Sequence, residues 1–459
     1  MVVSTTLYHS TRSLLRIAVS VVSLGLAPLV SAAGLTETVY PTGIHPTDAE
    51  NVQAAIEDGG RVLLKARDAS GIARAFNFGP PTSAGGFVFT SEGLTQDLEI
   101  LGERSRGSRT TIRGGFAPII LRGDHRTTVR GIFFENPRSA AIVVVRTAGL
   151  EIAHNHIANV VGDPAPFLPP GATKGQGIWL SHFIGSAPCL PCPAEDIRGE
   201  VSIHDNVIEN VEADEGFGVV LYGTDADVRV LRNQIRGVNT AAIYSVNNHR
   251  PVFIANNYLE PGPERSPILS FGDAILIDNT LYEEDDPSDG PTQIVGNTLV
   301  CENAFSWCID LWGPRGSNIV FNRVRLTTGG FQRGVSIIDV DTDASGNLVA
   351  LNRIEGSGEF ALAIQSFSGS PEIVFDSNGF LFNQMFGFDA LVADVFLDFT
   401  TENSLVLGEC ATYIDLGTNN VVACGEPVSA LRAAATHDSP PGSARSALRT
   451  LGSGVEPRT

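Results

Sequence analysis

The chain has 459 residues and a formal net charge of −20, with 51 acidic residues against 31 Lys and Arg. This balance argues against a nucleic-acid partner, because phosphate backbones require basic surfaces. It also disfavours a polyanionic glycan unless a cation or a local group of arginines intervenes.

Residues 1–32 have the three parts of an export signal. Arg12 and Arg16 precede the apolar run Ile17–Val30, and Val30-Ser31-Ala32 is a small-residue cleavage site. The apolar run is shorter than the roughly 20 residues of a membrane span, and no later segment is long and apolar enough to span. We expect a secreted or periplasmic mature chain; an uncleaved anchor is the alternative.

One short helix, at about residues 47–58, is predicted after the leader. Thr47 and Glu50 match a capping box, and Gly59-Gly60 would end the helix. The next segment, Arg61–Ala66, is predicted to be a strand. From there on, short apolar runs alternate with Gly, Asn, Asp and Pro, which indicates many short strands.

Two short sequence motifs alternate along the rest of the chain. The first places an asparagine in an apolar frame eight times, at Asn155, Asn206, Asn233, Asn257, Asn297, Asn322, Asn352 and Asn383. The second is a small residue followed by apolar-x-apolar, and its copies begin at Ala141, Gly177, Gly218, Ala242, Ala274, Cys308, Gly334 and Ala361. Such alternation predicts a coil that winds once per period and stacks its strands in parallel, about 4.8 Å apart. The asparagines would occupy a turn, tolerate left-handed geometry and bond one another from coil to coil.

This pattern resembles the right-handed parallel β-helix (pectin-lyase-like) superfamily, over roughly Thr47 to Gly425. The resemblance implies an all-β fold: a right-handed, single-stranded parallel β-helix (solenoid) with a short N-terminal capping helix. We expect one domain at residues 33–425 and a disordered tail at residues 426–459, which are rich in Ala, Ser, Pro, Gly and Arg. The superfamily's polygalacturonase motifs are largely missing, so known catalytic residues cannot be transferred.

The six cysteines form three local pairs, Cys189 with Cys192, Cys301 with Cys308, and Cys410 with Cys424. In an exported chain three disulfides are the natural interpretation, although other connectivities are open. A redox pair, or half of a zinc site with His182 and His204, is the alternative for Cys189 and Cys192.

In the second motif the apolar positions face the core, so the positions between them face outward. Aromatic residues and carboxylates gather on this predicted outward surface. The residues predicted to bind a saccharide are Trp179, Tyr222, Tyr244, Trp312, His182 and Lys174. Stacking on sugar rings would explain the aromatic residues; the general preference of exposed sheets for aromatic side chains is the alternative.

Asp278 and Asp310 are the predicted catalytic pair. They lie one coil apart and two residues out of step, which places their Cα atoms roughly 8 Å apart. An inverting glycosidase separates its carboxyl groups by about 6.5–9.5 Å so that a water fits between them. Two solvated acids in an acidic protein are the alternative.

Asp339, Asp341 and Asp343 alternate along the chain and are the candidate ligands of a Ca²⁺ ion. The acidic segment Glu283–Gly290 is a second candidate for the Ca²⁺ site.

The favoured function is a carbohydrate-active lyase or hydrolase whose partner is a polysaccharide or a cell-surface glycan. The alternative is a non-catalytic extracellular module that binds glycan or forms a rigid rod.

Overall fold

The computed structural model describes residues 36–57, 59–80, 86–90, 94, 97–105, 107–164, 172–181, 183–184, 187–188, 197–262, 272–279, 290–339, 343–367, 374–385 and 387–425. The predicted export signal and C-terminal tail therefore lie outside the described residues. His182, Cys189, Cys192 and Asp341 lie outside them as well.

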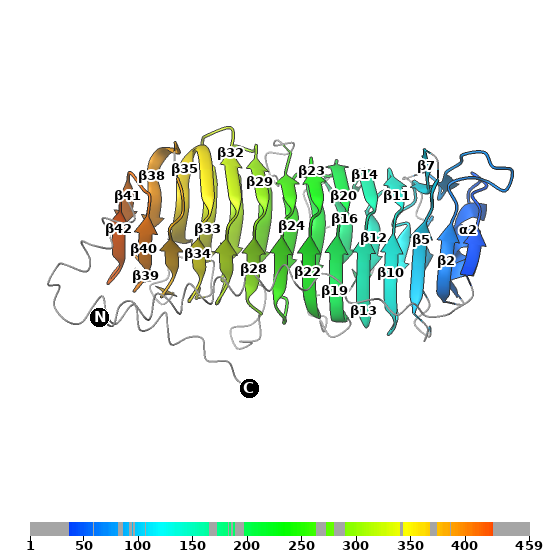
Figure 1. Cartoon of the computed structure of the whole chain (residues 1–459), viewed down its shortest axis with the longest axis horizontal. Coiled ribbons are helices and arrows are strands. Elements are labelled where there is room, and N and C mark those ends of the chain that lie inside the picture. Colours follow the sequence, from blue (N-terminus) through cyan, green and yellow to red (C-terminus); the bar gives the residue numbers. More distant parts are fainter. Residues whose placement is uncertain are drawn as a thin grey trace.

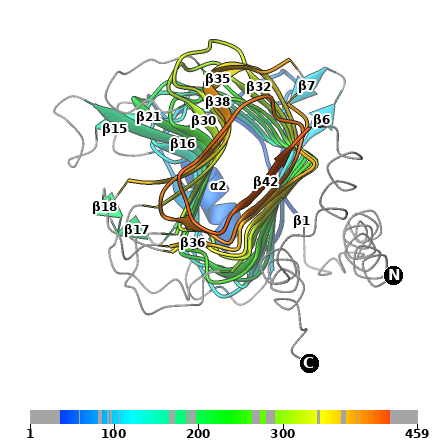
Figure 2. The same cartoon turned by 90° about the vertical axis from the view of Figure 1, so that its left-hand side faces the viewer.

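The described chain winds into a rod of stacked coils. Figure 1 shows the strands side by side along one long axis, with the helix α2 (Thr47–Glu57) at one end and β41 and β42 at the other. Viewed along this axis, the strands of successive coils superimpose around a common centre (Figure 2). This all-β solenoid confirms the predicted parallel β-helix.

Sheet I is the first of three parallel sheets to which the coils contribute. It begins with β1 beside β2 and ends with β40 beside β42. Its strands are β1 (Thr36–Val39), β2 (Gly60–Leu64), β5 (Leu98–Gly102), β10 (Arg126–Arg130), β13 (Gly149–Ala153), β19 (Arg198–His204), β22 (Asp225–Leu231), β25 (Val252–Ala255), β28 (Thr292–Val295), β31 (Asn318–Val320), β34 (Leu348–Ala350), β37 (Gly379–Leu381), β40 (Leu405–Gly408) and β42 (Val421–Cys424).

Sheet II follows sheet I in each coil. Its strands are β3 (Phe76–Asn77), β8 (Thr111–Arg113), β11 (Phe133–Glu135), β14 (His156–Val160), β20 (Val207–Val211), β23 (Gln234–Arg236), β26 (Tyr258–Glu260), β29 (Thr298–Cys301), β32 (Arg323–Leu326) and the first part of β35 (Arg353–Ser366). Because β35 pairs with β32 at its start and with β33 at its end, it joins sheets II and III into one continuous surface.

Sheet III carries the candidate site. Its strands are β4 (Val88–Phe89), β9 (Ile119–Leu121), β12 (Ala140–Val144), β16 (Thr173–Leu180), β21 (Glu215–Tyr222), β24 (Ala241–Val246), β27 (Asp273–Asp278), β30 (Trp307–Trp312), β33 (Arg333–Asp339), the end of β35, β38 (Asp389–Leu397) and β41 (Tyr413–Asp415). Short accessory strands lie outside the three sheets or at their edges: β6 (Arg104–Ser105), β7 (Ser108–Arg109), β15 (Asp163–Pro164), β17 (Phe183–Ile184), β18 (Ala187–Pro188), β36 (Phe375–Asp376) and β39 (Thr401–Glu402).

The eight repeated asparagines form a continuous ladder between sheets I and II. Each of the first seven donates from its side chain to Oδ1 of the next, as Asn233 does to Asn257 at 3.1 Å, and its backbone N–H donates to the same oxygen, here at 2.8 Å. Asn233 Nδ2 also donates to the carbonyl of Ile203 at 2.8 Å. The side chain is buried, so these bonds replace the water that the amide cannot reach.

The left-handed position of this corner belongs to the residue before each asparagine, not to the asparagine itself. His154, Asp205, Arg232 and Asn256 have φ between 51° and 56°. The prediction that the ladder residue adopts this conformation was therefore wrong by one position. The corner needs a left-handed residue pointing outward, whereas the ladder amide points inward to the stack.

The helix α2 closes the N-terminal end of the rod. Val52, Ala55 and Ile56 are buried against the first coil, and Figure 2 shows the helix behind the column of coils. Thr47 is the first helical residue instead of a cap. The buried Asp48 tethers the helix by accepting hydrogen bonds from the backbone N–H groups of Thr42 (2.6 Å), Gly43 (2.9 Å) and Asn77 (2.7 Å). A plug of this kind covers strand edges that would otherwise invite association.

Two of the three predicted disulfides lie within the described residues. Cys301–Cys308 has a Cα–Cα distance of 5.8 Å, and Cys410–Cys424 one of 5.0 Å. The second bond ties the last strand, β42, to the segment after β40, as expected for a clip on the final coil.

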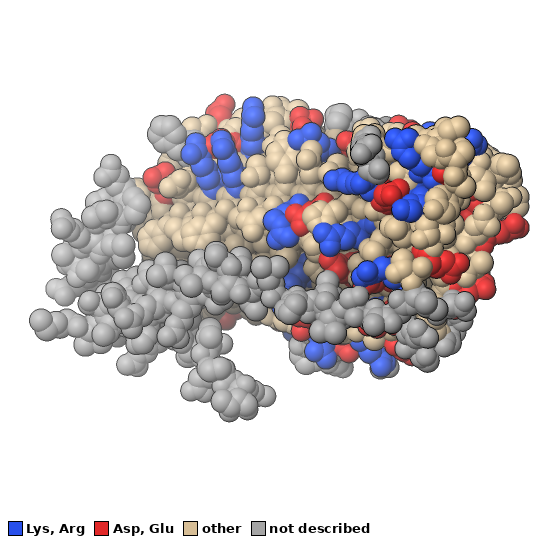
Figure 3. All heavy atoms as spheres, turned by 45° about the vertical axis from the view of Figure 1, so that its right-hand side comes forward, with Lys and Arg blue, Asp and Glu red and all other residues tan. Residues whose placement is uncertain are grey.

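The charged surface is mixed. On the face in Figure 3, acidic and basic side chains are interspersed. Register-matched ion pairs join neighbouring coils, such as Arg61 with Glu99 at 2.6 Å and Arg113 with Glu135 at 2.7 Å. Within the described part of the chain, no helix is long and apolar enough to cross a membrane.

Candidate functional site on the outer face of sheet III

The predicted outward-facing residues of sheet III form two rows across the coils. The first row runs through Trp179, Val220, Tyr244, Leu276, Asp310 and Ser336. The second contains Tyr222, Val246, Asp278, Trp312 and Ile338. Leu276 is the Cα partner of Asp310, so Asp278 is two residues out of step with it, as the repeat spacing predicted.

A third outward row was missed by the sequence analysis. Its members are Gln176, Phe217, Ala241, Asp273, Trp307, Arg333 and Phe360. Each directly precedes the small residue of the second repeated motif (small residue, then apolar-x-apolar). The small residue and the apolar residue after it are both buried in the core. The inward–outward alternation of side chains is therefore interrupted at this point, and the residue before the small residue faces outward. That fixed offset is the signal that could have found the row.

The aromatic residues of this face pack against one another. Trp179, Phe217, Val220, Ala241 and Leu276 form an apolar cluster, with Tyr222, Tyr244 and Trp312 packed against it. The rings of Phe217 and Tyr244 stack with centroids 5.1 Å apart and an interplanar angle of 14°. The predicted saccharide-binding aromatic residues therefore converge on one patch.

Three carboxyl groups lie beside this patch and are almost fully buried. Asp273 and Asp310 are each 2% exposed and Asp278 is 5% exposed. Trp312 Nε1 donates to Asp310 Oδ2 at 2.6 Å, the Tyr244 hydroxyl donates to Asp278 Oδ2 at 3.2 Å, and the Trp307 backbone N–H donates to Asp273 Oδ1 at 2.8 Å. The alternative of two solvated acids is wrong for this pair.

Burial sets the protonation of the cluster. It raises the pKa of Asp310 to about 8, against the opposing hydrogen bond from Trp312 and the charge of Arg333, and the neighbouring Asp278 raises it further. Burial also raises the pKa of Asp273 well above its ordinary value, with Asp310 adding to the effect. These effects favour the neutral carboxylic acid form of Asp310 at neutral pH.

Several buried polar atoms on this face have no hydrogen-bond partner among the described residues. They are Asp310 Oδ1, Ser336 Oγ, Arg333 Nη1 and both ends of the Gln176 amide. Ser336 is the Cα partner of Asp310. Arg333 is held by Glu359 through Nε at 2.9 Å and lies over the Trp307 ring at 4.3 Å. Buried polar groups without partners are rare and costly, so their concentration makes this face a candidate for ligand binding.

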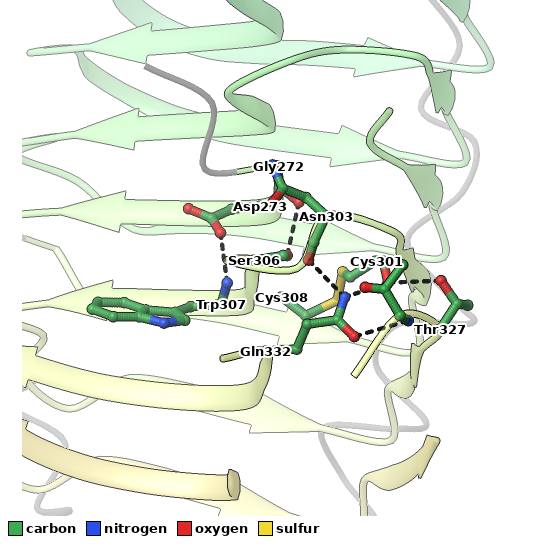
Figure 4. Close-up of a disulfide and its surroundings, with 10 residues drawn as sticks. Gly272, Asp273, Cys301, Asn303, Ser306, Trp307, Cys308, Thr327 and Gln332 are labelled. Atoms are coloured by element: carbon green, nitrogen blue, oxygen red, sulfur yellow. Dashed lines mark hydrogen bonds between the residues drawn. A yellow bond between two sulfur atoms is a disulfide. The ribbon is translucent and has the colours of Figure 1, made fainter. Parts of the chain in front are cut away.

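The starts of β30 and β33 are firmly held. The disulfide Cys301–Cys308 joins β29 to β30 directly beside Trp307 (Figure 4). Gln332 donates to the carbonyls of Cys301 (2.8 Å) and Asn303 (2.7 Å), which fixes the residue before Arg333. Binding groups on rigid strands keep their geometry better than groups on loops.

The remaining predicted site residues have different outcomes. Lys174 lies in β16 and not in a loop; it pairs with Glu215 at 3.3 Å and lies 5.4 Å from the centre of the Phe217 ring. His182 lies outside the described residues, as does most of Glu283–Gly290. Asp339 ends β33 but its side chain is not described, and Asp343 is exposed and accepts from the Val374 N–H at 3.0 Å. The Ca²⁺ site therefore stays a prediction.

Comparison with known proteins agrees with this architecture. A family model described as "Right handed beta helix region" matches residues 98–259. Together with the parallel sheets, this makes the chain a right-handed parallel β-helix protein. No curated protein matches the sequence.

Three solved structures are similar at low identity. The surface adhesin PfbA of Streptococcus pneumoniae has a TM-score of 0.46 and 11% identity, over 82% of this chain and 93% of that one. The Dettilon tailspike protein gives 0.42 and 12%, over 84% and 68%. The A-module of the mannuronan C-5 epimerase AlgE6 of Azotobacter vinelandii gives 0.35 and 12%, over 82% and 96%. Likenesses this distant carry no functional argument.

Proposed function

We propose that the outer face of sheet III, between β16 and β33, binds a polysaccharide, and that Asp310 and Asp278 hydrolyse it. The observation that carries this proposal is Asp310, a buried carboxyl with a pKa of about 8. One of its oxygens accepts from Trp312, and the other has no partner among the residues that the structure describes. General acids of glycosidases have a raised pKa of this kind.

In the proposed reaction Asp310 donates its proton to the glycosidic oxygen, and the bond from that oxygen to the anomeric carbon breaks. Asp278, oriented by the Tyr244 hydroxyl, takes a proton from a water whose oxygen attacks the same carbon. The register places the two Cα atoms roughly 8 Å apart, since the strands are about 4.8 Å apart and the residues are two positions out of step. A similar separation of the two carboxyl groups would favour inversion over retention.

The substrate is an extended chain in this proposal. Gln176 on β16 lies four strand steps from Asp310 on β30, or about 19 Å along the rod. Sugar hydroxyls can both donate and accept, so they suit the Gln176 amide, Ser336 and Arg333 alike. The aromatic patch between the two ends would contact the apolar faces of the sugar rings.

The two disulfides support an extracytoplasmic location, because such bonds persist in oxidising compartments. Such a location would agree with the predicted export signal and with a polysaccharide substrate outside the cell.

Non-catalytic glycan binding is the second candidate, and the close packing of the aromatic patch favours it. In that case the acids would bond hydroxyls without transferring protons. The two functions share the surface and differ in the role of Asp310.

A polysaccharide panel tests the proposal by release of reducing ends and by binding. We expect Asp310→Asn to lower hydrolysis at least about 100-fold while binding persists. Asp227→Asn, which changes an exposed acid on sheet I, is the matched control and should leave hydrolysis intact. Binding without hydrolysis in the wild-type chain selects the second candidate, and unsaturated products would indicate a lyase. A chain that binds no member of the panel would contradict both functions.

Parallel assays with a chelator and with added Ca²⁺ test the predicted calcium site.

A further inference from the structure

Three side chains from two neighbouring coils converge at the corner between sheets I and II. One nitrogen or oxygen atom from each of His154, His204 and Asp205 lies within 4.8 Å of the others. His154 and Asp205 occupy the outward, left-handed corner position in successive coils, both with φ of 55°. The stacking of the backbone itself therefore brings them together.

Hydrogen bonds orient the imidazole of His204. Its Nε2 lies 3.2 Å from Glu151 Oε1 on β13, and its Nδ1 lies 2.8 Å from Asp205 Oδ2. A carboxylate behind one ring nitrogen is the usual way to aim the other nitrogen at a metal ion. Arg232 donates two hydrogen bonds to the Asp205 carboxylate, from Nε to Oδ1 at 2.9 Å and from Nη2 to Oδ2 at 2.7 Å, and these keep the carboxylate facing His204.

The third group, His154, has an uncommitted ring. It meets His204 edge-on, with ring centroids 5.8 Å apart and an angle of 82°. Within the described residues its ring nitrogens have no hydrogen-bond partner. A half-buried imidazole with free nitrogens, beside a second imidazole and a carboxylate, supplies the missing third donor.

We propose that His154, His204 and Asp205 bind a divalent transition-metal ion, with Zn²⁺ as the best fit. Two imidazole nitrogens and one carboxylate oxygen suit Zn²⁺, and a water would complete four-coordination. The ion takes the place of the contact between His204 Nδ1 and Asp205. This site is separate from the acidic cluster on sheet III and does not depend on the proposed hydrolysis.

The location gives the ion a structural role. Asn155 and Asn206, the ladder residues that follow His154 and Asp205, are 51 residues apart, whereas the later steps span 24 to 40 residues. Closing a longer excursion costs more chain entropy. An ion bound by both coils would stabilise the stack where the segment between successive ladder asparagines is longest.

Calorimetric titration of the oxidised, chelator-treated full chain with Zn²⁺ tests this proposal. The variants His154→Asn and Asp205→Asn remove a ligand, and asparagine tolerates the left-handed backbone at both positions. We expect each to weaken Zn²⁺ binding by at least about tenfold. His156→Ala, which changes a neighbouring histidine engaged with Glu209 and Arg109, is the matched control and should bind like the wild type.

Two further measurements sharpen the result. Co²⁺ bound at the same site should show the strong visible absorption of a four-coordinate ion, and Zn²⁺ should raise Tm in the wild type but not in His154→Asn. Equal Zn²⁺ affinity in the wild type and both ligand variants would overturn the proposal. Binding that survives His154→Asn but is lost in Cys189→Ser would also overturn it, because the ion would then belong to the cysteine pair.

Discussion

Trp312 donates its indole N–H to Asp310 at 2.6 Å, from two residues further along the same strand. Residues two apart on a strand share a face, so this bond fixes the carboxyl plane of Asp310 on the outer side of sheet III. It engages Oδ2 and leaves Oδ1 buried, with no hydrogen-bond partner in the part of the chain that the structure describes.

Asp310 should make stability fall as pH rises. Its folded pKa of about 8 lies above the ordinary value of about 3.9 expected in the unfolded chain. Between these values the folded chain keeps a proton that the unfolded chain has lost, so the free energy of unfolding decreases with increasing pH. Asp310→Asn removes this effect, and the variant should gain stability relative to wild type, by on the order of 5 kcal/mol at about pH 8 compared with about pH 4.

Urea denaturation at several pH values checks this prediction. Asp227→Asn, on the exposed face of sheet I, should show no such gain. A constant difference between Asp310→Asn and wild type across the range would mean that Asp310 is ionised in the folded chain.

Breaking the asparagine ladder should destabilise the rod. Asn233→Ala removes two bonds donated by Nδ2 and leaves the Asn206 side chain and backbone N–H without their acceptor. Because these groups are buried, we expect a loss of about 3 kcal/mol. The urea midpoint measures it, and Asn318→Ala, at a half-buried position on β31, should change it by less than about 0.5 kcal/mol. Similar losses in both variants would contradict the ladder's role.

Gly356 should tolerate no side chain. A Cβ there would lie 1.8 Å from the carbonyl oxygen of Leu326 on the neighbouring coil. Gly346 has a similarly left-handed backbone, with φ of 65°, but open space around it. Gly356→Ala should therefore cost at least about 3 kcal/mol and Gly346→Ala about 1 kcal/mol, since only backbone strain acts in the second. Thermal melting of the pair separates the clash from the strain.

The two described disulfides should differ in their response to a reductant. Cys301 and Cys308 are fully buried, whereas Cys410 and Cys424 are partly exposed. Mild reduction followed by alkylation and mass spectrometry should label the C-terminal pair first, because thiol exchange requires access to sulfur. Hydrogen exchange should then increase in β42 while β30 stays protected. Simultaneous labelling of both pairs would contradict this order.

The winding of the chain was predictable because it repeats. Each period places an asparagine at one corner and a small residue within a strand of sheet III, and parallel stacking converts these intervals into columns along the rod. The offset of Asp278 from Asp310 followed from the same register. The row containing Asp273 and Arg333 was missed because the strand alternation slips beside the small residue, where two consecutive side chains turn inward.

Local sequence therefore determined the solenoid, its register and two of the outward rows of sheet III, since these depend on residues within one coil. Only the tertiary structure decided which outward groups lose contact with water, which keep a proton and which meet across an insert. The burial of Asp310 depends on side chains from neighbouring coils, and His154 meets Asp205 across a separation of 51 residues. Solvation and long-range proximity are properties of the assembled stack, and no single repeat contains them.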